Sequence, residues 1–398
     1  MKKIIIVFYA VCLFIVSCTT KHETSVKPDI LASNIDSTIN PADDFFDYAN
    51  GGWIKNNPIP EAESGWGIGN LVEEEIYDRK KTINEKALAA NAANGTVTQK
   101  IGDFWYSGID TTNIEKQGLK PLQPEINEIN NIKSINDLIN VTADFHNKKI
   151  NVLFDDYAAQ DDKNSEMIVY HLGQGGLGMP DRDYYFKTDA STVNVRKAYQ
   201  NFLVRTLQQL SINNNSILND SAAISKEAQS VYALETNLAK ASRKIEDLRD
   251  PYHNYNKMTV PQLQKLMPDF IWSIYLTRIG INKLDSAIVG QPEFFSALNK
   301  ELKTNFDVWK NYLKVHLILE AAPYLDSETY SNYFNYRKSL TGVSEPRPRW
   351  KRVLQCPECV MKIWMMHLCT DMPQLQQLVM KSHMVLMTRE DCMMKREI

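Results

Sequence analysis

The chain has 398 residues, of which 43% are hydrophobic and 23% are charged, and this balance argues against an intrinsically disordered chain and against a fibrous one. Its length leaves room for two or three domains of about 150 residues each. The formal net charge is only −3, with 45 basic and 48 acidic side chains along the chain, so the electrostatics give no reason to expect a nucleic-acid partner.

Residues 1–18 have the pattern of a bacterial export signal. Two lysines precede a mostly apolar run over residues 4–16, which is too short to span a bilayer that requires about 20 residues. The run ends in Ile-Val-Ser-Cys, which resembles the lipobox of bacterial lipoproteins, so we expect Cys18 to be the lipidated first residue of the mature chain. The alternative is a plain secretory signal with an incidental cysteine. Residues 19–40 are polar and lack apolar periodicity, which is typical of a flexible tether.

The body of the chain is predicted to be mostly α-helical. Asn40 can cap a first helix and Pro41 suits its first turn, and the pair Gly51-Gly52 is expected to end it. A second helix is predicted over residues 71–93, with Gly95 as its terminator. Apolar residues recur at helical spacing in five further stretches, 195–211, 222–243, 260–267, 294–319 and 327–340.

Two short runs interrupt the helical pattern with β-like sequence. Residues 150–154 and 166–172 are rich in Val, Ile and Tyr and are separated by the polar residues 160–165, so they predict one small β-hairpin and not a sheet-based domain. The next residues, 173–178, match G-x-G-x-x-G, but two aspartates follow where a bound phosphate would lie. We therefore interpret this stretch as a tight glycine turn that closes the hairpin against the helices.

No motif for nucleophilic or metal-assisted catalysis occurs in the reading frame. The seven histidines nowhere form H-E-x-x-H or H-x-x-E-H, and G-x-S-x-G is absent. His316 and Glu320 are four residues apart and could share a metal ion, but the apolar residues around them favour a packed core histidine. We expect no catalytic residue, no metal ligand and no bound cofactor in this chain.

Residues 355–398 differ abruptly in composition from the body. They hold nine of the 14 methionines and four of the six cysteines. Cys356 and Cys359 form C-x-x-C, and His367 and Cys369 follow, which in isolation would suggest a zinc or redox module. An exported chain whose body lacks cysteine is a poor setting for such a module, so a different origin for this tail is favoured.

Several stretches of the body occur in an order that is typical of one family. They are 40–53 (Asn-Pro-Ala-Asp-Asp-Phe-Phe-Asp-Tyr-Ala-Asn-Gly-Gly-Trp), 56–60 (Asn-Asn-Pro-Ile-Pro), 176–185 (Gly-Leu-Gly-Met-Pro-Asp-Arg-Asp-Tyr-Tyr), 249–259 (with Arg-Asp-Pro and Tyr-Asn-Lys-Met-Thr), 291–295 (Gln-Pro-Glu-Phe-Phe) and 348–352 (Pro-Arg-Trp-Lys-Arg). Together they resemble the N-terminal part of the neprilysin family of zinc metalloendopeptidases. The resemblance implies that residues 41–354 form a neprilysin-like helical domain, which in the family covers the catalytic domain and limits access to short peptides.

The chain departs from the family pattern at two informative places in the body. Animal members carry cysteines where this chain has Ala42 and Asn50, so the disulfides of those relatives are missing. Many relatives have an arginine where this chain has Gly65, so no substrate-binding arginine is carried over.

The family's zinc site is missing from the reading frame but can be recovered from a shifted one. The resemblance implies peptide-bond hydrolysis at a zinc ion held by two histidines and one glutamate. Joining the last base of each codon to the first two of the next permits G-H-E-I-S-H-G-F-D-D-Q-G-R-L-Y-D-E-K-G-N across residues 378–398, which resembles the family's zinc helix. We interpret residues 355–398 as a non-native, frame-shifted tail and the chain as a truncated form.

The resemblance and the signal pattern together favour a lipid-anchored zinc metalloendopeptidase of the bacterial cell envelope. We expect this 398-residue chain itself to be inactive, because the zinc site is missing from its reading frame. Its expected partners are oligopeptide substrates and a membrane, with no nucleic acid, and zinc is expected only in the intact family member. The alternative is a non-catalytic helical lipoprotein that binds peptides.

Metabolic labelling with a fatty acid in the native bacterium should tag the protein, and Cys18→Ala should abolish the label. Each buried methylene of an acyl chain contributes about 0.8 kcal/mol, so several chains together make the attachment durable. Label and membrane association that survive Cys18→Ala would show the lipobox interpretation to be wrong.

Overall fold

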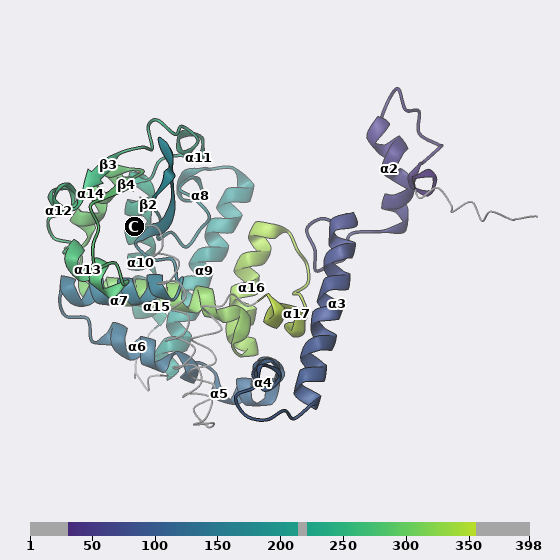
Figure 1. The fold of residues 1–398 in the computed structure, drawn as a ribbon, viewed down its shortest axis with the longest axis horizontal. Helices are drawn as coiled ribbons and strands as arrows, with labels where there is room; N and C mark the ends of the chain where they lie inside the picture. Colours follow the sequence, from purple (N-terminus) through teal and green to yellow (C-terminus); the bar gives the residue numbers. More distant parts are fainter. Residues whose placement is uncertain (1–30, 214–220, 356–398) are drawn as a thin grey trace, which may run out of the picture. The chain divides into compact units, whose positions relative to one another are not determined.

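The computed structural model describes residues 31–213 and 221–355, and the chain divides into two compact units between Gly67 and Ile68 (Figure 1). The predicted lipidation site at Cys18 and the cysteines of the tail lie outside the described residues. Within the described ranges, none of the helices has both the length and the apolar character needed to cross a membrane.

The first unit is built on a short 3-10 helix, η2 (Ala32–Asn34), and the helix α2 (Phe45–Asn56). The sequence predicted that α2 would begin at Asn40 and Pro41, but the helix begins at Phe45 because Asp44 is its N-cap. The Asp44 side chain accepts a hydrogen bond from the backbone N–H of Asp47 at 2.9 Å.

The prediction that Gly51-Gly52 ends this helix is wrong. The helix continues through both glycines to Asn56. A Cβ atom at Gly51 would lie 2.8 Å from Cβ of Asp36, and one at Gly52 would lie 2.8 Å from the backbone oxygen of Ser33. The glycines therefore serve the close approach of the preceding segment to the helix, which is a tertiary requirement that local sequence does not reveal.

The second unit is mostly α-helical, as the sequence predicted (Figure 1). Its helices are α3 (Ile68–Ala89), α4 (Val97–Ile109), α5 (Thr111–Gln117), η3 (Lys120–Leu122), α6 (Gln123–Asn130), α7 (Ile135–Asn147), α8 (Asp183–Phe186), α9 (Ala190–Asn213), α10 (Ser221–Ala241), α11 (Ile245–Leu248), α12 (Val260–Leu266), α13 (Trp272–Arg278), α14 (Pro292–Glu301), α15 (Phe306–Ala321), η4 (Ala322–Tyr324), α16 (Ser327–Thr341) and α17 (Arg349–Leu354).

One predicted helical stretch, residues 294–319, is two helices in the structure. The chain leaves α14 after Glu301 and begins α15 at Phe306. Asn305 caps α15, since its side-chain oxygen accepts a hydrogen bond from the backbone N–H of Asp307 at 2.8 Å. The apolar spacing continues across the break because both helices face the same core.

A hairpin is present, but its first strand runs over Phe154–Asp161 and not over the predicted residues 150–154, and the hairpin belongs to a four-stranded sheet. Ile150, Val152 and Leu153 precede the strand and are buried, so their apolar character reflects burial in the core and not strand pairing. Strands β1 (Phe154–Asp161) and β2 (Asn164–Gln174) pair antiparallel, and the sheet order is β1-β2-β4-β3. Strand β4 (Ser286–Val289) lies parallel to β2, and β3 (Lys257–Thr259) lies antiparallel to β4. Both missed strands have four residues or fewer, which is too short to establish an alternating pattern.

Residues 175–178 of the glycine stretch pack on the helices as predicted, whereas Gly173 and Gln174 are the last residues of β2 and not part of a turn. Tyr312 of α15 donates a hydrogen bond to the backbone oxygen of Gly176 at 2.8 Å, and Tyr336 of α16 donates one to that of Gly178 at 2.8 Å. Gly176 has φ of +71°, which favours glycine. A Cβ atom at Gly178 would lie 1.8 Å from the hydroxyl of Tyr199, so no larger residue fits there.

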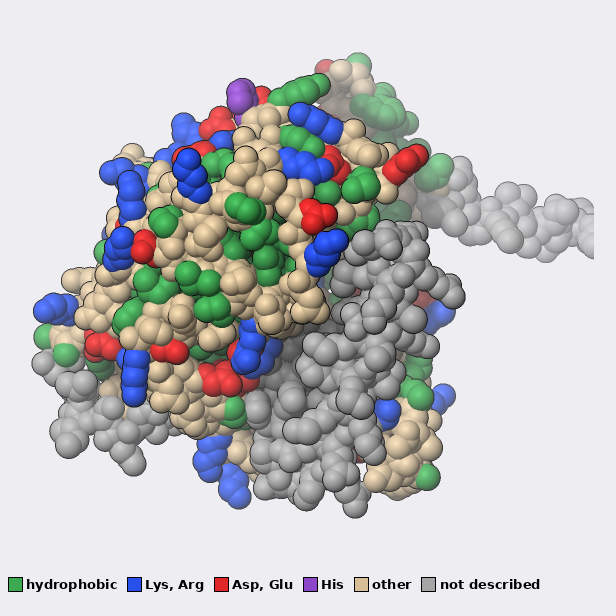
Figure 2. All heavy atoms as spheres, turned by 60° about the vertical axis from the view of Figure 1, so that its left-hand side comes forward, with side chains coloured by type: hydrophobic (Ala, Val, Ile, Leu, Met, Phe, Trp, Pro, Cys, Tyr) green, Lys and Arg blue, Asp and Glu red, His purple; other side chains and the backbone are tan. Residues whose placement is uncertain are grey.

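The main core lies where α9, α10 and α15 pack on one another and against the sheet (Figure 1). Its largest fully buried side chains are aromatic, among them Trp272, Trp309, Tyr199, Tyr312 and Phe154. On the outer face shown in Figure 2, basic and acidic side chains of the described residues are interspersed and do not gather by sign.

Gly178→Ala should lower the free energy of unfolding by about 1–3 kcal/mol, because the added Cβ must displace the buried Tyr199. Urea unfolding followed by circular dichroism measures the change. The matched control is Gly69→Ala in α3, where no atom lies within 4 Å of the new Cβ and the stability should hold or rise. Equal behaviour of the two variants would contradict the packing described here.

Candidate functional site

His316, the histidine singled out from the sequence, lies in the core of the second unit. It is 3% exposed, and its Nδ1 donates to the backbone oxygen of Asn151 at 3.0 Å. Its Nε2 lies 3.0 Å from Oε1 of Glu235 on α10. The carboxylate that it meets is thus Glu235 and not Glu320, and the packed core histidine is what the structure contains.

Glu235 is the centre of a buried polar network that the sequence analysis missed. Its side chain is fully buried, and it accepts hydrogen bonds from the hydroxyls of Tyr199 at 2.7 Å and Tyr185 at 2.8 Å. Burial, followed by the nearby carboxylate, raises the pKa of both tyrosines well above the usual value. These groups are closed to solvent, so the network holds helices together and offers no surface for substrate. The only available signal was one acidic residue on the apolar face of a predicted helix.

A second buried cluster joins α7 and α13 to the hairpin. His146 of α7 lies 3.1 Å from Oδ1 of Asp156 and 2.6 Å from the hydroxyl of Tyr275, and Tyr170 donates to Oδ2 of Asp156 at 2.7 Å. Burial would raise the pKa of Asp156, but the hydrogen bonds from His146 and Tyr170 and the charge of His146 outweigh burial and hold it below the usual value. The cluster fastens two helices to one strand pair.

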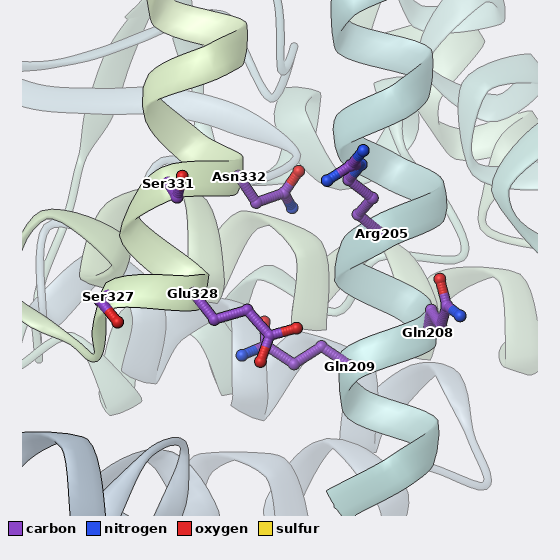
Figure 3. Close-up of a pocket in the computed structure, with 7 residues that line it drawn as sticks. All are labelled: Arg205, Gln208, Gln209, Ser327, Glu328, Ser331 and Asn332. Atoms are coloured by element: carbon purple, nitrogen blue, oxygen red, sulfur yellow. The ribbon is translucent and has the colours of Figure 1, made fainter. Parts of the chain in front are cut away.

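A polar pocket of about 630 Å³ lies between α9 and α16 (Figure 3). Figure 3 shows Arg205 and Asn332 pointing toward each other from the two helices, with Gln209 and Glu328 doing the same nearby. The lining side chains are Arg205, Gln208 and Gln209 from α9 and Ser327, Glu328, Ser331 and Asn332 from α16. This volume is within the range of small-ligand sites, about 300–1,000 Å³.

Hydrogen bonds between the two helices hold the walls of this pocket in place. The amide nitrogen of Gln209 donates to the hydroxyl of Thr329 at 2.7 Å. The amide nitrogen of Asn332 donates to the hydroxyl of Thr206 at 3.1 Å and to the backbone oxygen of Phe202 at 3.3 Å. Because these contacts join residues 206 to 332 and 209 to 329, the two helices run antiparallel along the pocket.

The family motif at residues 348–352 includes the start of α17 and anchors this helix to its neighbours. Arg349 donates to the backbone oxygens of Gly108 at 2.8 Å and Leu325 at 3.0 Å, and its burial lowers its pKa to about 10. The guanidinium of Arg352 lies 3.5 Å from the ring centroid of Tyr330. These contacts tie the last described helix to α4, η4 and α16.

The histidine and acidic side chains of the described residues do not converge on a common point. Across residues 31–213 and 221–355, no group of three or more His, Cys, Asp or Glu side chains gathers where it could hold a metal ion. The four histidines in these ranges have separate surroundings: His146 at Asp156, His171 stacked on Tyr157, His253 at Asp250 and His316 at Glu235.

Comparison with known proteins identifies relatives over most of the chain. Residues 41–368 match the N-terminal model of peptidase family M13. Endothelin-converting enzyme 1 of Rattus norvegicus is 28% identical over 349 residues, which is 84% of this chain and 44% of the relative. Neprilysin of Mus musculus is 28% identical over 81% of this chain and 46% of its own length. The chain thus spans less than half the length of these curated relatives.

A solved structure has the same fold. The crystal structure of the Mycobacterium tuberculosis zinc metalloprotease Zmp1 in complex with an inhibitor superposes with a TM-score of 0.74 at 26% identity, covering 88% of this chain and 51% of that protein. The mostly helical architecture with its small sheet is therefore a fold that a solved zinc metalloprotease shares.

Glu235→Ala should destabilise the protein by about 3–5 kcal/mol, because it leaves two tyrosine hydroxyls and a histidine nitrogen buried without their partner. Thermal and urea unfolding measure the loss. Lys226→Ala, at an exposed position of the same helix, is the control and should change stability by less than about 0.5 kcal/mol. A small effect of Glu235→Ala would mean that the network does not organise the core.

Proposed function

The chain belongs to peptidase family M13, and from this we propose that it is the helical, substrate-enclosing part of a zinc metalloendopeptidase that hydrolyses oligopeptides. The observation that carries the proposal is the match over residues 41–368, together with the structural use of the motifs within it. The glycine stretch packs under α9, α15 and α16, and the motif at 348–352 clamps α17.

The zinc ion of such an enzyme does not fit the residues that the structure describes. A catalytic zinc site requires three protein ligands, commonly histidines with a carboxylate, and an open position for water. Each histidine in the described ranges already faces its own separate partner, and no three donors converge. When zinc is bound in an intact family member, it polarises a water molecule for attack on the peptide bond. We derive no catalytic step for this chain and propose that it is inactive as written.

The absence of the zinc ligands is explained, in this proposal, by a frame shift after Leu354. The composition of residues 355–398 and the zinc-helix sequence permitted by the shifted frame support it. The family match extends in the given reading frame to Leu368, and this part of the tail runs against a shift that begins directly after Leu354. Sequencing the gene past the codon for Leu354 tests the proposal, and a single clean frame through Ile398 would overturn it.

The proposed location is the bacterial cell envelope, with a lipid anchor at Cys18. The charged start, the apolar run and the lipobox at residues 1–18 support this placement. A peptidase held there would meet oligopeptides outside the cytoplasm.

A second candidate function is a lipoprotein that binds peptides without cleaving them. The pocket between α9 and α16 favours it, because that pocket requires no metal ion. Zinc content and peptide hydrolysis of the natural gene product distinguish the two candidates. Stoichiometric zinc with hydrolysis supports the peptidase, and peptide binding without either supports the lipoprotein.

The expressed 398-residue chain should bind no stoichiometric zinc and should not cleave a fluorogenic oligopeptide, since H-E-x-x-H is absent from it. Metal analysis and a fluorescence assay with and without a chelator measure both properties. The Mycobacterium tuberculosis zinc metalloprotease, assayed in parallel, serves as the positive control. Chelator-sensitive cleavage by this chain would refute the proposal that it is inactive.

A further inference from the structure

The pocket between α9 and α16 contains two opposite charges that do not neutralise each other. Arg205 and Glu328 are both exposed side chains of its lining, and within the described ranges neither forms an ion pair or a hydrogen bond through its side chain. Other polar groups at the same place are engaged: the hydroxyl of Thr329 donates to Asp326 at 2.7 Å, and that of Ser327 donates to Glu115 at 2.9 Å. The pocket thus offers one cation and one anion to a ligand.

The spacing of these two charges follows from the antiparallel packing of the helices. Arg205 lies near the level of Asn332, and Glu328 lies near the level of Gln209 (Figure 3). Four residues along a helix correspond to about one turn, or roughly 5.4 Å, and packed helix axes lie about 8–10 Å apart. The axial offset and the axis spacing together separate the two backbone positions by about 10–12 Å. Both side chains line the pocket and reach inward, so the gap that remains between their charges suits a short peptide at about 3.3–3.6 Å per residue.

The chemistry of the remaining lining suits a peptide backbone. All seven lining side chains are polar, so the pocket selects little by apolar side-chain contact. The hydroxyl of Ser331 and the amide of Gln208 can hydrogen-bond a peptide group, since a hydroxyl both donates and accepts and an amide side chain does the same. A guanidinium binds a carboxylate through two parallel hydrogen bonds.

We propose that this pocket binds a short peptide with two free ends, whose terminal carboxylate pairs with Arg205 and whose terminal ammonium pairs with Glu328. The inference rests on the proposed function, because hydrolysis of oligopeptides yields short peptides with such ends. It deepens that function by assigning a product-binding site on the helical half. Binding here requires no zinc and no catalytic residue.

The test is isothermal titration of the full chain with Ala-Ala, with its N-acetyl form and with its C-terminal amide. Ala-Ala should bind with a Kd of about 1 mM or lower, and each capped form should bind at least about tenfold more weakly. Arg205→Gln should weaken Ala-Ala and remove the preference over the amide, and Glu328→Gln should remove the preference over the acetylated form. Lys226→Gln, at an exposed position outside the pocket, should leave all three affinities unchanged.

Several results would overturn the proposal. They are no binding of Ala-Ala by the folded chain, equal binding of capped and free forms, or unchanged affinity in Arg205→Gln. Circular dichroism and the Tm of each variant establish that it is folded, which is expected because both side chains are exposed. If Ala-Ala fails to bind while the natural gene product hydrolyses peptides, only the pocket assignment falls. If Ala-Ala binds while that product lacks zinc and hydrolysis, the peptidase proposal falls instead.

Discussion

The arrangement of the helical unit depends on one buried carboxylate, that of Glu235 at the centre of α10. Removing a polar side chain from water is costly unless hydrogen bonds compensate it. Here the compensation comes from Tyr185 of α8, Tyr199 of α9 and His316 of α15. Each donor is on a different helix, so all three helices must approach α10 within hydrogen-bond distance. A single buried acid thereby determines which elements surround the core helix.

The glycine stretch and the polar pocket follow from the same constraint. Tyr199 is held by Glu235 through its hydroxyl, and this hydroxyl occupies the space where a Cβ at Gly178 would lie. Tyr336 of α16 donates to the backbone of Gly178, and its ring centroid is 5.1 Å from that of Tyr199. These contacts set the spacing of α9 and α16. The pocket lined by Arg205 and Glu328 lies between the same two helices, so its width depends on a network whose residues do not line it.

The chain belongs to peptidase family M13, but the features described above are structural, and none of them identifies a catalytic group among the described residues. Among the described residues, the motifs that the chain shares with its family have structural roles. Gly51 and Gly52 allow a neighbouring segment to approach α2, the glycine stretch packs on tyrosines, and Arg349 anchors α17 to its neighbours. The described residues contribute packing and polar contacts, and no three metal-binding side chains converge among them. A peptide-binding role for the pocket is compatible with either candidate function.

The sequence by itself determined the helical class, the positions of the long helices α3, α9, α10 and α16, the presence of a hairpin, the core placement of His316 and the family, because these depend on local periodicity and contiguous motifs. It did not predict helices α4 to α7 and α13, or where the first strand of the hairpin begins. Only the tertiary structure decided why α2 passes through Gly51-Gly52, how β3 and β4 complete the sheet, and what Glu235 does. The pocket could not be predicted from the sequence either, because the hydrogen bond from Gln209 to Thr329 that holds its walls joins residues 120 positions apart. Side chains so distant in the chain meet only when helices pack, and a single sequence carries no periodic signal for such a meeting.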